Sequence, residues 1–429
     1  MLITDATLPD GRTRDIRVDG ETIAEIDETL STTPDERTID GSGKRLSPGM
    51  IDVHVHFRQP GYAHKETWET GSKSAAAGGV TTVVDQPNTD PPTIDGETFD
   101  QKLDFAANSL VDFGINGGVT DEWLPNILLR RPLFALGEVF LADSTGNMGI
   151  DADLFADALQ QATDRDITVT VHAEDATRFN ESAREREDAD AWSAYRAAQA
   201  EIEAVRRACA VATNHDAQIH IAHTSTPEAI DIAAESGMTC EVSPHHLFLS
   251  RDDLPELGTF GRMNPPLRRE NRRRKVFERV ADGTVDMIAT DHAPHTREEK
   301  DAGIWDAPSG VPGVETALPL LLDEARGGTL GYERVRDLTA ANPASVFGIS
   351  NKGRIEEGFD ADLVLFDPDE PREIRGEDTH TRCDWTPFEG FAGIFPELTM
   401  VRGTVVYENR REELFSDPVG QNVREASVR

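Results

Sequence analysis

Short β-like runs alternate with helix-like segments through most of this chain, and this alternation limits the folds that the chain can adopt. The β-like runs mostly finish in polar residues, and they occupy residues 50–56, 79–88, 112–119, 136–143, 166–175, 218–225, 238–246 and 286–295. Between them, apolar residues recur every three to four positions, which is the helical period. These helix-like segments include residues 66–78, 97–108, 153–163, 196–213, 226–236 and 269–281.

Eight alternating β/α units predict an α/β fold in which parallel strands close into a (β/α)8 TIM-like barrel. A doubly wound open sheet is the alternative that the same alternation allows. The two ends of the chain contain short strands and turns without this rhythm. We therefore expect a barrel domain over residues 49–349 and a small composite β domain built from residues 1–48 and 350–429. Pro and Gly punctuate both junctions, in "SPGMID" and "NKGRIEEGFDAD".

The formal net charge of −36 argues against nucleic acid and anionic membranes as partners. The sequence has no long apolar run and no basic segment followed by an apolar one at its start, so we expect a cytoplasmic protein. A cytosol of very high salt would screen the self-repulsion of such a charge, which predicts a halophilic protein. Cys209, Cys240 and Cys383 match no disulfide or metal pattern and are interpreted as buried thiols.

Histidines and one acidic residue stand at the ends of several predicted strands. His54 and His56 are two residues apart and project to the same side of the first strand. His172, His223 and Asp291 finish three other strands. Barrels place their active sites at these strand ends, and imidazoles gathered with a carboxylate are metal ligands. The pattern therefore predicts a hydrolase with one or two divalent metal ions.

Other histidines are interpreted differently. His220 precedes His223 by three residues and lies on the opposite side of its strand, which indicates a structural role. The same interpretation applies to His215, His246 and His292. His245 receives no assignment.

An ordered set of motifs carries a resemblance to a known family. The set includes "SPGMIDVHVHFRQPG", "VHAED", "HIAHTST", "NPPLR", "IATDHAPH", "APSGVPGVETALPLLL" and "GRIEEGFDADLVLFD". The chain resembles the amidohydrolase superfamily, and within it the dihydroorotases of the type related to allantoinases and hydantoinases. The resemblance covers nearly the whole chain. It implies a (β/α)8 barrel with a composite β domain, in agreement with the fold predicted from the alternation.

The resemblance also implies which residues hold metal. His54 and His56 would bind the more buried ion with Asp291, and His172 and His223 would bind the second. Zinc is the metal we expect, with two ions per subunit, although manganese or cobalt fits the same ligands.

One position departs from the family pattern. Many relatives have a lysine at the end of the fourth strand, and its carboxylated form bridges the two metals. This chain has Glu138 there, and its carboxylate is already an anion that can span two cations. We expect Glu138 to be the bridge. Asp143 in its place, or a site with a single metal, are the alternatives.

The implied reaction is the interconversion of N-carbamoyl-L-aspartate and dihydroorotate in pyrimidine biosynthesis. A metal-bridging hydroxide would be the nucleophile, and Asp291 would be the general acid and base. Arg58 lies on the same face as the first two histidines, and its planar guanidinium suits the carboxylate of the substrate. A surface salt bridge is the alternative role for Arg58. The family's other substrate-binding positions fall on Asn88, Asn264, His295, Ser309 and Gly310.

Two other functions fit parts of the pattern. Another cyclic amidase, allantoinase or dihydropyrimidinase, would use the same metal site on a ring without a carboxylate. A non-catalytic paralogue would only bind a partner such as a carbamoyltransferase, but the complete histidine set argues against it. A homodimer and an association with a carbamoyltransferase are both compatible with the resemblance.

Overall fold

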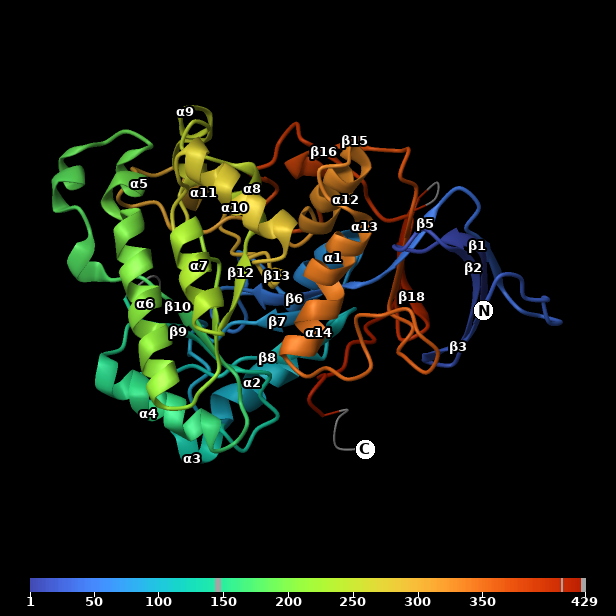
Figure 1. The fold of residues 1–429 in the computed structure, drawn as a ribbon, viewed down its shortest axis with the longest axis horizontal. Helices are drawn as coiled ribbons and strands as arrows, with labels where there is room; N and C mark the ends of the chain where they lie inside the picture. Colours follow the sequence, from blue (N-terminus) through green and yellow to red (C-terminus); the bar gives the residue numbers. More distant parts are fainter. Residues whose placement is uncertain (143–147, 410–411, 426–429) are drawn as a thin grey trace.

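Eight parallel strands form the centre of the computed structural model, which describes residues 1–142, 148–409 and 412–425 (Figure 1). The strands are β6 (Met50–Val55), β7 (Val80–Asp85), β8 (Asp112–Ile115), β9 (Leu136–Phe140), β10 (Val169–His172), β11 (Ile219–Ile221), β12 (Thr239–Val242) and β13 (Met287–Ile288). They make a three-stranded sheet, β6-β7-β8, and a five-stranded sheet, β13-β12-β11-β10-β9.

Two seams join these sheets into a closed barrel. A parallel bridge between Gly117 and Leu136 links the region of β8 to β9, and another between Val55 and His292 links β6 to the segment after β13. Every neighbouring strand pair within the two sheets is also parallel. The predicted (β/α)8 barrel is therefore confirmed, and the open-sheet alternative is excluded.

The helices pack outside the barrel, and those expected from the sequence lie within two residues of their expected bounds. They are α1 (Trp68–Ala77), α2 (Gly96–Ala106), α4 (Ala152–Thr163), α6 (Ala198–Asn214), α7 (Pro227–Glu235) and α10 (Glu270–Asp282). Local chemistry sets their ends. Thr67 and Asp95 begin α1 and α2 with capping boxes, and Gly283, at φ 97°, ends α10 in the left-handed conformation.

Further helices were not anticipated from the sequence. The longest, α12 (Ala317–Gly327), follows the last barrel strand. The others are α3 (Pro125–Leu128), α5 (Ala191–Tyr195), α8 (Pro244–Phe248), α9 (Leu254–Leu257), α11 (Arg297–Lys300), α13 (Tyr332–Arg336), α14 (Asn342–Val346), η1 (Ala176–Arg178), η2 (Glu181–Glu185), η3 (Gly258–Gly261), η4 (Asp337–Ala341) and η5 (Gly376–Asp378). The expected strand at 238–246 thus ends early, because Pro244 begins α8. None of the helices in the described ranges combines the length and apolar content that a membrane crossing needs.

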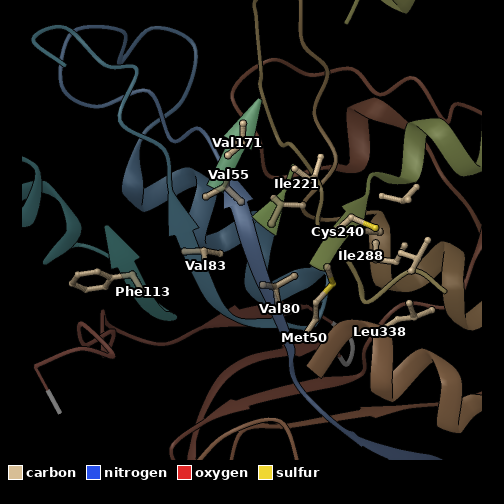
Figure 2. Close-up of a cluster of buried hydrophobic side chains, with 14 of the residues drawn as sticks. Met50, Val55, Val80, Val83, Phe113, Val171, Ile221, Cys240, Ile288 and Leu338 are labelled. Carbon is tan, nitrogen blue, oxygen red and sulfur yellow. The ribbon is translucent and has the colours of Figure 1, made fainter. Parts of the chain in front are cut away.

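The hydrophobic core lies between the barrel strands and the surrounding helices (Figure 2). Every residue of β6 and β7 is buried, as is usual for parallel strands that are covered on both faces. Met50, Val80, Val171 and Ile288 belong to this core and are at most 1% exposed. Each such side chain contributes about 1.5–3 kcal/mol to stability, so the barrel is a rigid support for the strand ends.

Strands from both ends of the chain form one nine-stranded sheet beside the barrel (Figure 1). Its order is β19-β18-β17-β14-β5-β1-β2-β3, with β4 paired to β1. The N-terminal strands are β1 (Leu2–Thr7), β2 (Thr13–Asp19), β3 (Thr22–Asp27), β4 (Thr38–Asp40) and β5 (Arg45–Pro48). The C-terminal strands are β14 (Leu363–Phe366), β17 (Leu398–Val401), β18 (Thr404–Asn409) and β19 (Glu413–Phe415), while β15 (Arg372–Glu373) and β16 (Ala392–Gly393) pair separately.

Buried charges and the end of the chain connect this sheet to the barrel. Lys352 contacts three carboxylates, those of Asp112 on β8, Asp360 and Asp362. The backbone N–H of Phe113 on β8 donates to the carbonyl of Gln421 at 2.9 Å. The last described residues therefore return to the barrel.

Candidate active site

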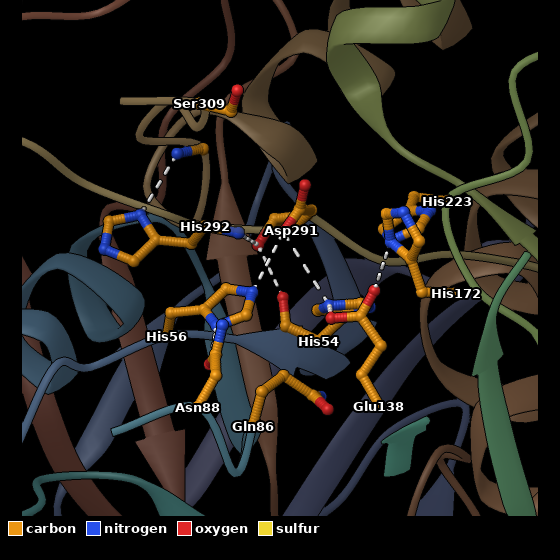
Figure 3. Close-up of polar contacts among 12 residues, drawn as sticks. His54, His56, Gln86, Asn88, Glu138, His172, His223, Asp291, His292 and Ser309 are labelled. Carbon is orange, nitrogen blue, oxygen red and sulfur yellow. Dashed lines mark hydrogen bonds and ion pairs between the residues drawn. The ribbon is translucent and has the colours of Figure 1, made fainter. Parts of the chain in front are cut away.

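The metal ligands expected from the sequence converge at one end of the barrel (Figure 3). His54 lies in β6 and His56 follows it, while Glu138 lies in β9. The other three stand at or just beyond the ends of strands, and they are His172 as the last residue of β10, His223 after β11 and Asp291 after β13. All six side chains are buried. Asp143, the alternative to Glu138, lies outside the described residues.

Glu138 belongs to both groups of potential ligands at this end of the barrel. One group is His54, His56 and Glu138, the other is Glu138, His172 and His223, and in each group the ligand atoms lie within 4.8 Å of one another. Oε1 of Glu138 is 2.8 Å from His172 Nδ1 and 2.6 Å from His223 Nε2, whereas Oε2 is 3.4 Å from His54 Nε2. One carboxylate oxygen therefore faces each group.

Asp291 adds a second carboxylate beside the first group. Its Oδ1 lies 3.1 Å from His56 Nε2 and 3.7 Å from His54 Nε2. Burial opposes the ionisation of Asp291, but the neighbouring His56 and His54 lower its pKa below the usual range. Burial likewise opposes the ionisation of Glu138, and the charges of His54 and His223 hold its pKa well below the usual range. Both acids are therefore anions.

Three imidazoles each have one ring nitrogen that points away from the cluster of candidate ligands, and an oxygen of a surrounding side chain contacts this outward nitrogen. His54 Nδ1 lies 2.7 Å from Glu241 Oε1, His56 Nδ1 lies 2.7 Å from Asn88 Oδ1, and His172 Nε2 lies 3.1 Å from Glu174 Oε2. Because these oxygens accept hydrogen bonds, each outward nitrogen carries the proton in the neutral ring. When a metal ion displaces any second proton, the inward nitrogen presents a lone pair.

The donor set fits divalent cations. In that tautomer the lone pair of His56 Nε2 faces the carboxylate of Asp291 at 3.1 Å, an arrangement of two acceptors that a cation between them would satisfy. His54 Nε2 is buried and has no hydrogen-bond partner among the described residues. Imidazole nitrogens with carboxylate oxygens suit zinc, manganese or cobalt. The residues therefore fit one or two metal ions.

Glu241 and Glu174 contact the candidate ligands His54 and His172, and neither acid was predicted from the sequence. Glu241 Oε2 also accepts a hydrogen bond from His220 Nε2 at 3.1 Å, which gives His220 a structural place next to the site. The guanidinium of Arg196 donates through Nε to Glu174 Oε2 at 2.9 Å. A signal was present, since both acids stand inside or directly after apolar strands, where an unpaired carboxylate is costly.

A pocket opens above these ligands. Its lining residues are His56, Arg58, Asn88, Glu138, Phe140, His172, His223, Asn264, Asp291, Ala293, Ser309 and Gly310. The lining thus includes five of the six residues expected to bind substrate. Arg58 is buried, which argues against the surface salt bridge, and its Nε donates to the carbonyl of Pro294 at 3.2 Å.

His295, the sixth expected residue, lies behind this lining. Its Nδ1 accepts from Lys65 Nζ at 3.1 Å, and its Nε2 donates to the carbonyl of Ser309 at 3.0 Å. Burial, followed by the charge of Arg58, lowers the pKa of His295 well below its usual range. The imidazole is therefore neutral, and it supports the segment that contributes Ser309 to the pocket.

Three site residues have a left-handed backbone, which is rare for residues other than glycine. Arg58 has φ 64°, His223 has φ 34° and Asp291 has φ 48°. Such conformations cost of order 1–3 kcal/mol each and are concentrated at functional sites. The rigid barrel described above stabilises them.

Comparisons with known proteins agree with this geometry. The model of the amidohydrolase family matches residues 45–406. A dihydroorotase of Halobacterium salinarum is 64% identical over 426 residues, which cover 99% of this chain and 100% of that protein. A dihydroorotase of Methanosarcina acetivorans is 42% identical, with 92% and 89% covered. The solved L-hydantoinase (dihydropyrimidinase) of Arthrobacter aurescens superposes with a TM-score of 0.93 at 28% identity, with 98% of each chain covered.

Proposed function

Because the chain belongs to the amidohydrolase family, we propose that its buried histidine and carboxylate site carries out a dihydroorotase reaction. The protein is a cyclic amide hydrolase, and this reaction interconverts N-carbamoyl-L-aspartate with dihydroorotate and water. One observation favours this substrate over other cyclic amides. The buried guanidinium of Arg58 lines the same pocket as the ligands, and dihydroorotate carries a carboxylate that hydantoin and allantoin lack.

The family is metal-dependent, and we propose two zinc ions as the metals of this site. His54, His56 and Asp291 would hold one, His172 and His223 the other, and Glu138 would bridge them. When bound, such ions lower the pKa of water and polarise the scissile carbonyl. The position of Glu138 in both ligand groups supports the bridging role.

Within this proposal Asp291 moves the proton. In ring opening, its carboxylate accepts a proton from the attacking water and passes it to the departing ring nitrogen. In ring closure, it removes a proton from the carbamoyl nitrogen. A positioned general acid and base of this kind contributes typically about 10²–10⁴-fold to the rate. The low pKa of Asp291 supports this role, because only the ionised carboxylate can accept the proton.

Arg58 would orient the substrate by binding its carboxylate with the two-pronged guanidinium. The net charge of −36 repels an anionic substrate from the molecule as a whole. Local positive charge must therefore offset this field at the pocket. Arg58 lines the pocket and supplies such charge, whereas the charge of Lys65 is paired with Glu299 at 3.1 Å.

We also propose that the protein works in a cytoplasm of high salt. The dihydroorotase of Halobacterium salinarum, at 64% identity, and the strongly acidic composition both support this environment.

Substrate turnover tests the proposed function. Protein purified in molar KCl and loaded with zinc should open dihydroorotate and close N-carbamoyl-L-aspartate, while allantoin and hydantoin should react far more slowly. The likeness to the L-hydantoinase makes hydantoin the sharpest comparison. Equal turnover of hydantoin and dihydroorotate would contradict the choice of substrate.

A further inference from the structure

We propose that Lys300 is a positioning residue that sets the shape of the substrate wall of the pocket, a role that rests on the proposed function of that pocket. Lys300 ends α11 and is 0% exposed. Its Nζ donates to the carbonyl oxygens of Arg262 at 2.9 Å, Pro308 at 3.0 Å and Gly310 at 3.0 Å. The three N–H groups of the ammonium thus have one acceptor each.

These carbonyls belong to two segments that are far apart in the sequence but adjacent at the pocket. One segment leads from Arg262 to Asn264, and the other contains Ser309 and Gly310. Asn264, Ser309 and Gly310 line the pocket. The N–H of Gly310 also donates to the carbonyl of Arg262 at 3.0 Å. Lys300 therefore connects, through hydrogen bonds, the two segments that form one side of the pocket.

Side chains extend this arrangement to the residues that face the pocket. Nε of Arg262 donates to Ser309 Oγ at 3.2 Å, and its guanidinium stacks 3.7 Å from the ring centre of Trp192. The indole N–H of Trp192 in turn donates to Asn264 Oδ1 at 3.0 Å. A shift of the Arg262 backbone would consequently displace both Ser309 and Asn264.

The helix that carries Lys300 starts next to the proposed catalytic segment. Thr296 caps α11 and forms a capping box with Glu299, directly after His295 and five residues after Asp291. Lys300 thereby fixes the distance between the segment that moves the proton and the wall that holds the ring.

Loss of the ammonium would remove the lysine donor from the buried carbonyls of Pro308 and Gly310, while the carbonyl of Arg262 would keep the N–H of Gly310 as a donor. Each unsatisfied buried acceptor costs about 1–3 kcal/mol, so the two segments would move apart to reach water or other donors. Displacement of the two segments that carry Asn264, Ser309 and Gly310 predicts weaker substrate binding.

A merely structural lysine would lower stability without changing substrate binding, and Arg334 provides the matched control. Arg334 also fastens backbone carbonyls, donating to Val280 at 2.7 Å and Val285 at 2.6 Å. Val285 precedes β13, whereas Asp291 follows it, so Arg334 lies at the opposite end of the same strand.

The test compares Lys300→Met with Arg334→Met in zinc-loaded protein. Lys300→Met should raise KM for dihydroorotate at least about tenfold, equivalent to about 1.4 kcal/mol, with a smaller change in kcat and an unchanged metal content. Arg334→Met should lower Tm and leave KM within about twofold of the wild-type value. Should Lys300→Met fail to fold, Lys300→Gln, which keeps two N–H donors, should still raise KM at least about threefold. An unchanged KM in the folded lysine variant, or a loss of kcat and metal at constant KM, would overturn the proposal.

Amide hydrogen exchange separates this inference from the proposed function. In substrate-free protein the Gly310 amide should exchange at least about tenfold faster in Lys300→Met than in Arg334→Met. If the wild type fails to turn over dihydroorotate, the proposed function is wrong, and faster exchange would still support the positioning role. Equal exchange in the two variants would refute that role.

Discussion

Glu241 orients the imidazole of His54, because Oε1 of the carboxylate lies 2.7 Å from Nδ1 of the ring. The same oxygen accepts the backbone N–H of His223 at 3.2 Å. Burial opposes the ionisation of Glu241, but His54 and His220 hold its pKa below the usual range. One anion on β12 therefore orients a ligand from each of the two groups.

We expect Glu241→Gln to weaken metal binding about 10–100-fold, because a neutral amide fixes the imidazole less well and places an N–H where an acceptor is needed. Competition with a chromophoric chelator measures this affinity. Glu315→Gln is the control, since Glu315 is also buried but pairs with His380 outside the site. Wild-type affinity in Glu241→Gln would contradict the expectation.

The two-metal proposal makes Glu138→Gln informative. An amide is a poor bridge between two cations, so the variant should retain at most one equivalent of zinc, while the wild type and Glu315→Gln retain two. Elemental analysis of dialysed protein gives the stoichiometry. Two equivalents in Glu138→Gln would show that another group bridges, and one equivalent in the wild type would favour a mononuclear site.

Arg58 should matter only for substrates with a carboxylate. Arg58→Met should raise KM for dihydroorotate about 100-fold, since a charge-assisted pair contributes about 1.5–3 kcal/mol. Arg58→Lys keeps the charge but loses the two-pronged geometry, so an effect of about tenfold is expected. Slow hydantoin turnover serves as the internal control and should be unaffected. A parallel loss with hydantoin would assign Arg58 a different role.

Salt should stabilise the protein by screening its net charge of −36. The Debye length falls from about 10 Å at 0.1 M to about 3 Å at 1 M. Scanning calorimetry should therefore show a rise in Tm on the order of 10 °C between dilute buffer and molar KCl. Sucrose at matched osmolality does not screen charge and is the control. An equal rise in sucrose would remove the electrostatic explanation.

The raised pKa of His380 predicts that the free energy of unfolding falls in mildly alkaline solution. Burial would lower its pKa, but hydrogen bonds and charges from Glu315 and Glu413 raise the pKa to about 9, above the usual histidine value of 6.5. The raised pKa contributes stability that is fully present below pH 6.5 and is lost as pH rises to about 9, on the order of 2 kcal/mol. Urea unfolding at pH 6 and pH 9.5 measures the difference. His380→Gln should flatten this change, and an unaltered pH dependence in the variant would exclude His380 as its cause.

The alternation of β and α segments was sufficient to predict the barrel, because each unit buries its apolar face in a way that few other folds allow. The pair His54 and His56 was equally informative. Side chains two residues apart on a strand share one side, and barrel strands end at a common rim. Both predictions depend on short-range periodicity, which a single sequence displays directly.

Long-range partners were the part that the sequence did not reveal. Lys300 stands among charged neighbours in "TREEK", a pattern typical of an exposed helix, yet its acceptors come from residues 262, 308 and 310. Glu241 contacts His54 across 187 positions. Only the closed barrel brings such residues together, so their roles follow from tertiary structure and not from local pattern.

The two seams of the barrel have a practical consequence. His54 and His56 come from the three-stranded sheet, whereas Glu138, His172 and His223 come from the five-stranded one, and one backbone bridge crosses each seam. A gene split between β8 and β9 would place the ligands on separate polypeptides. The C-terminal fragment would keep the group of Glu138, His172 and His223, whereas His54 and His56 would be on the other fragment, so uptake of a second zinc equivalent by a mixture of the fragments would report their reassembly.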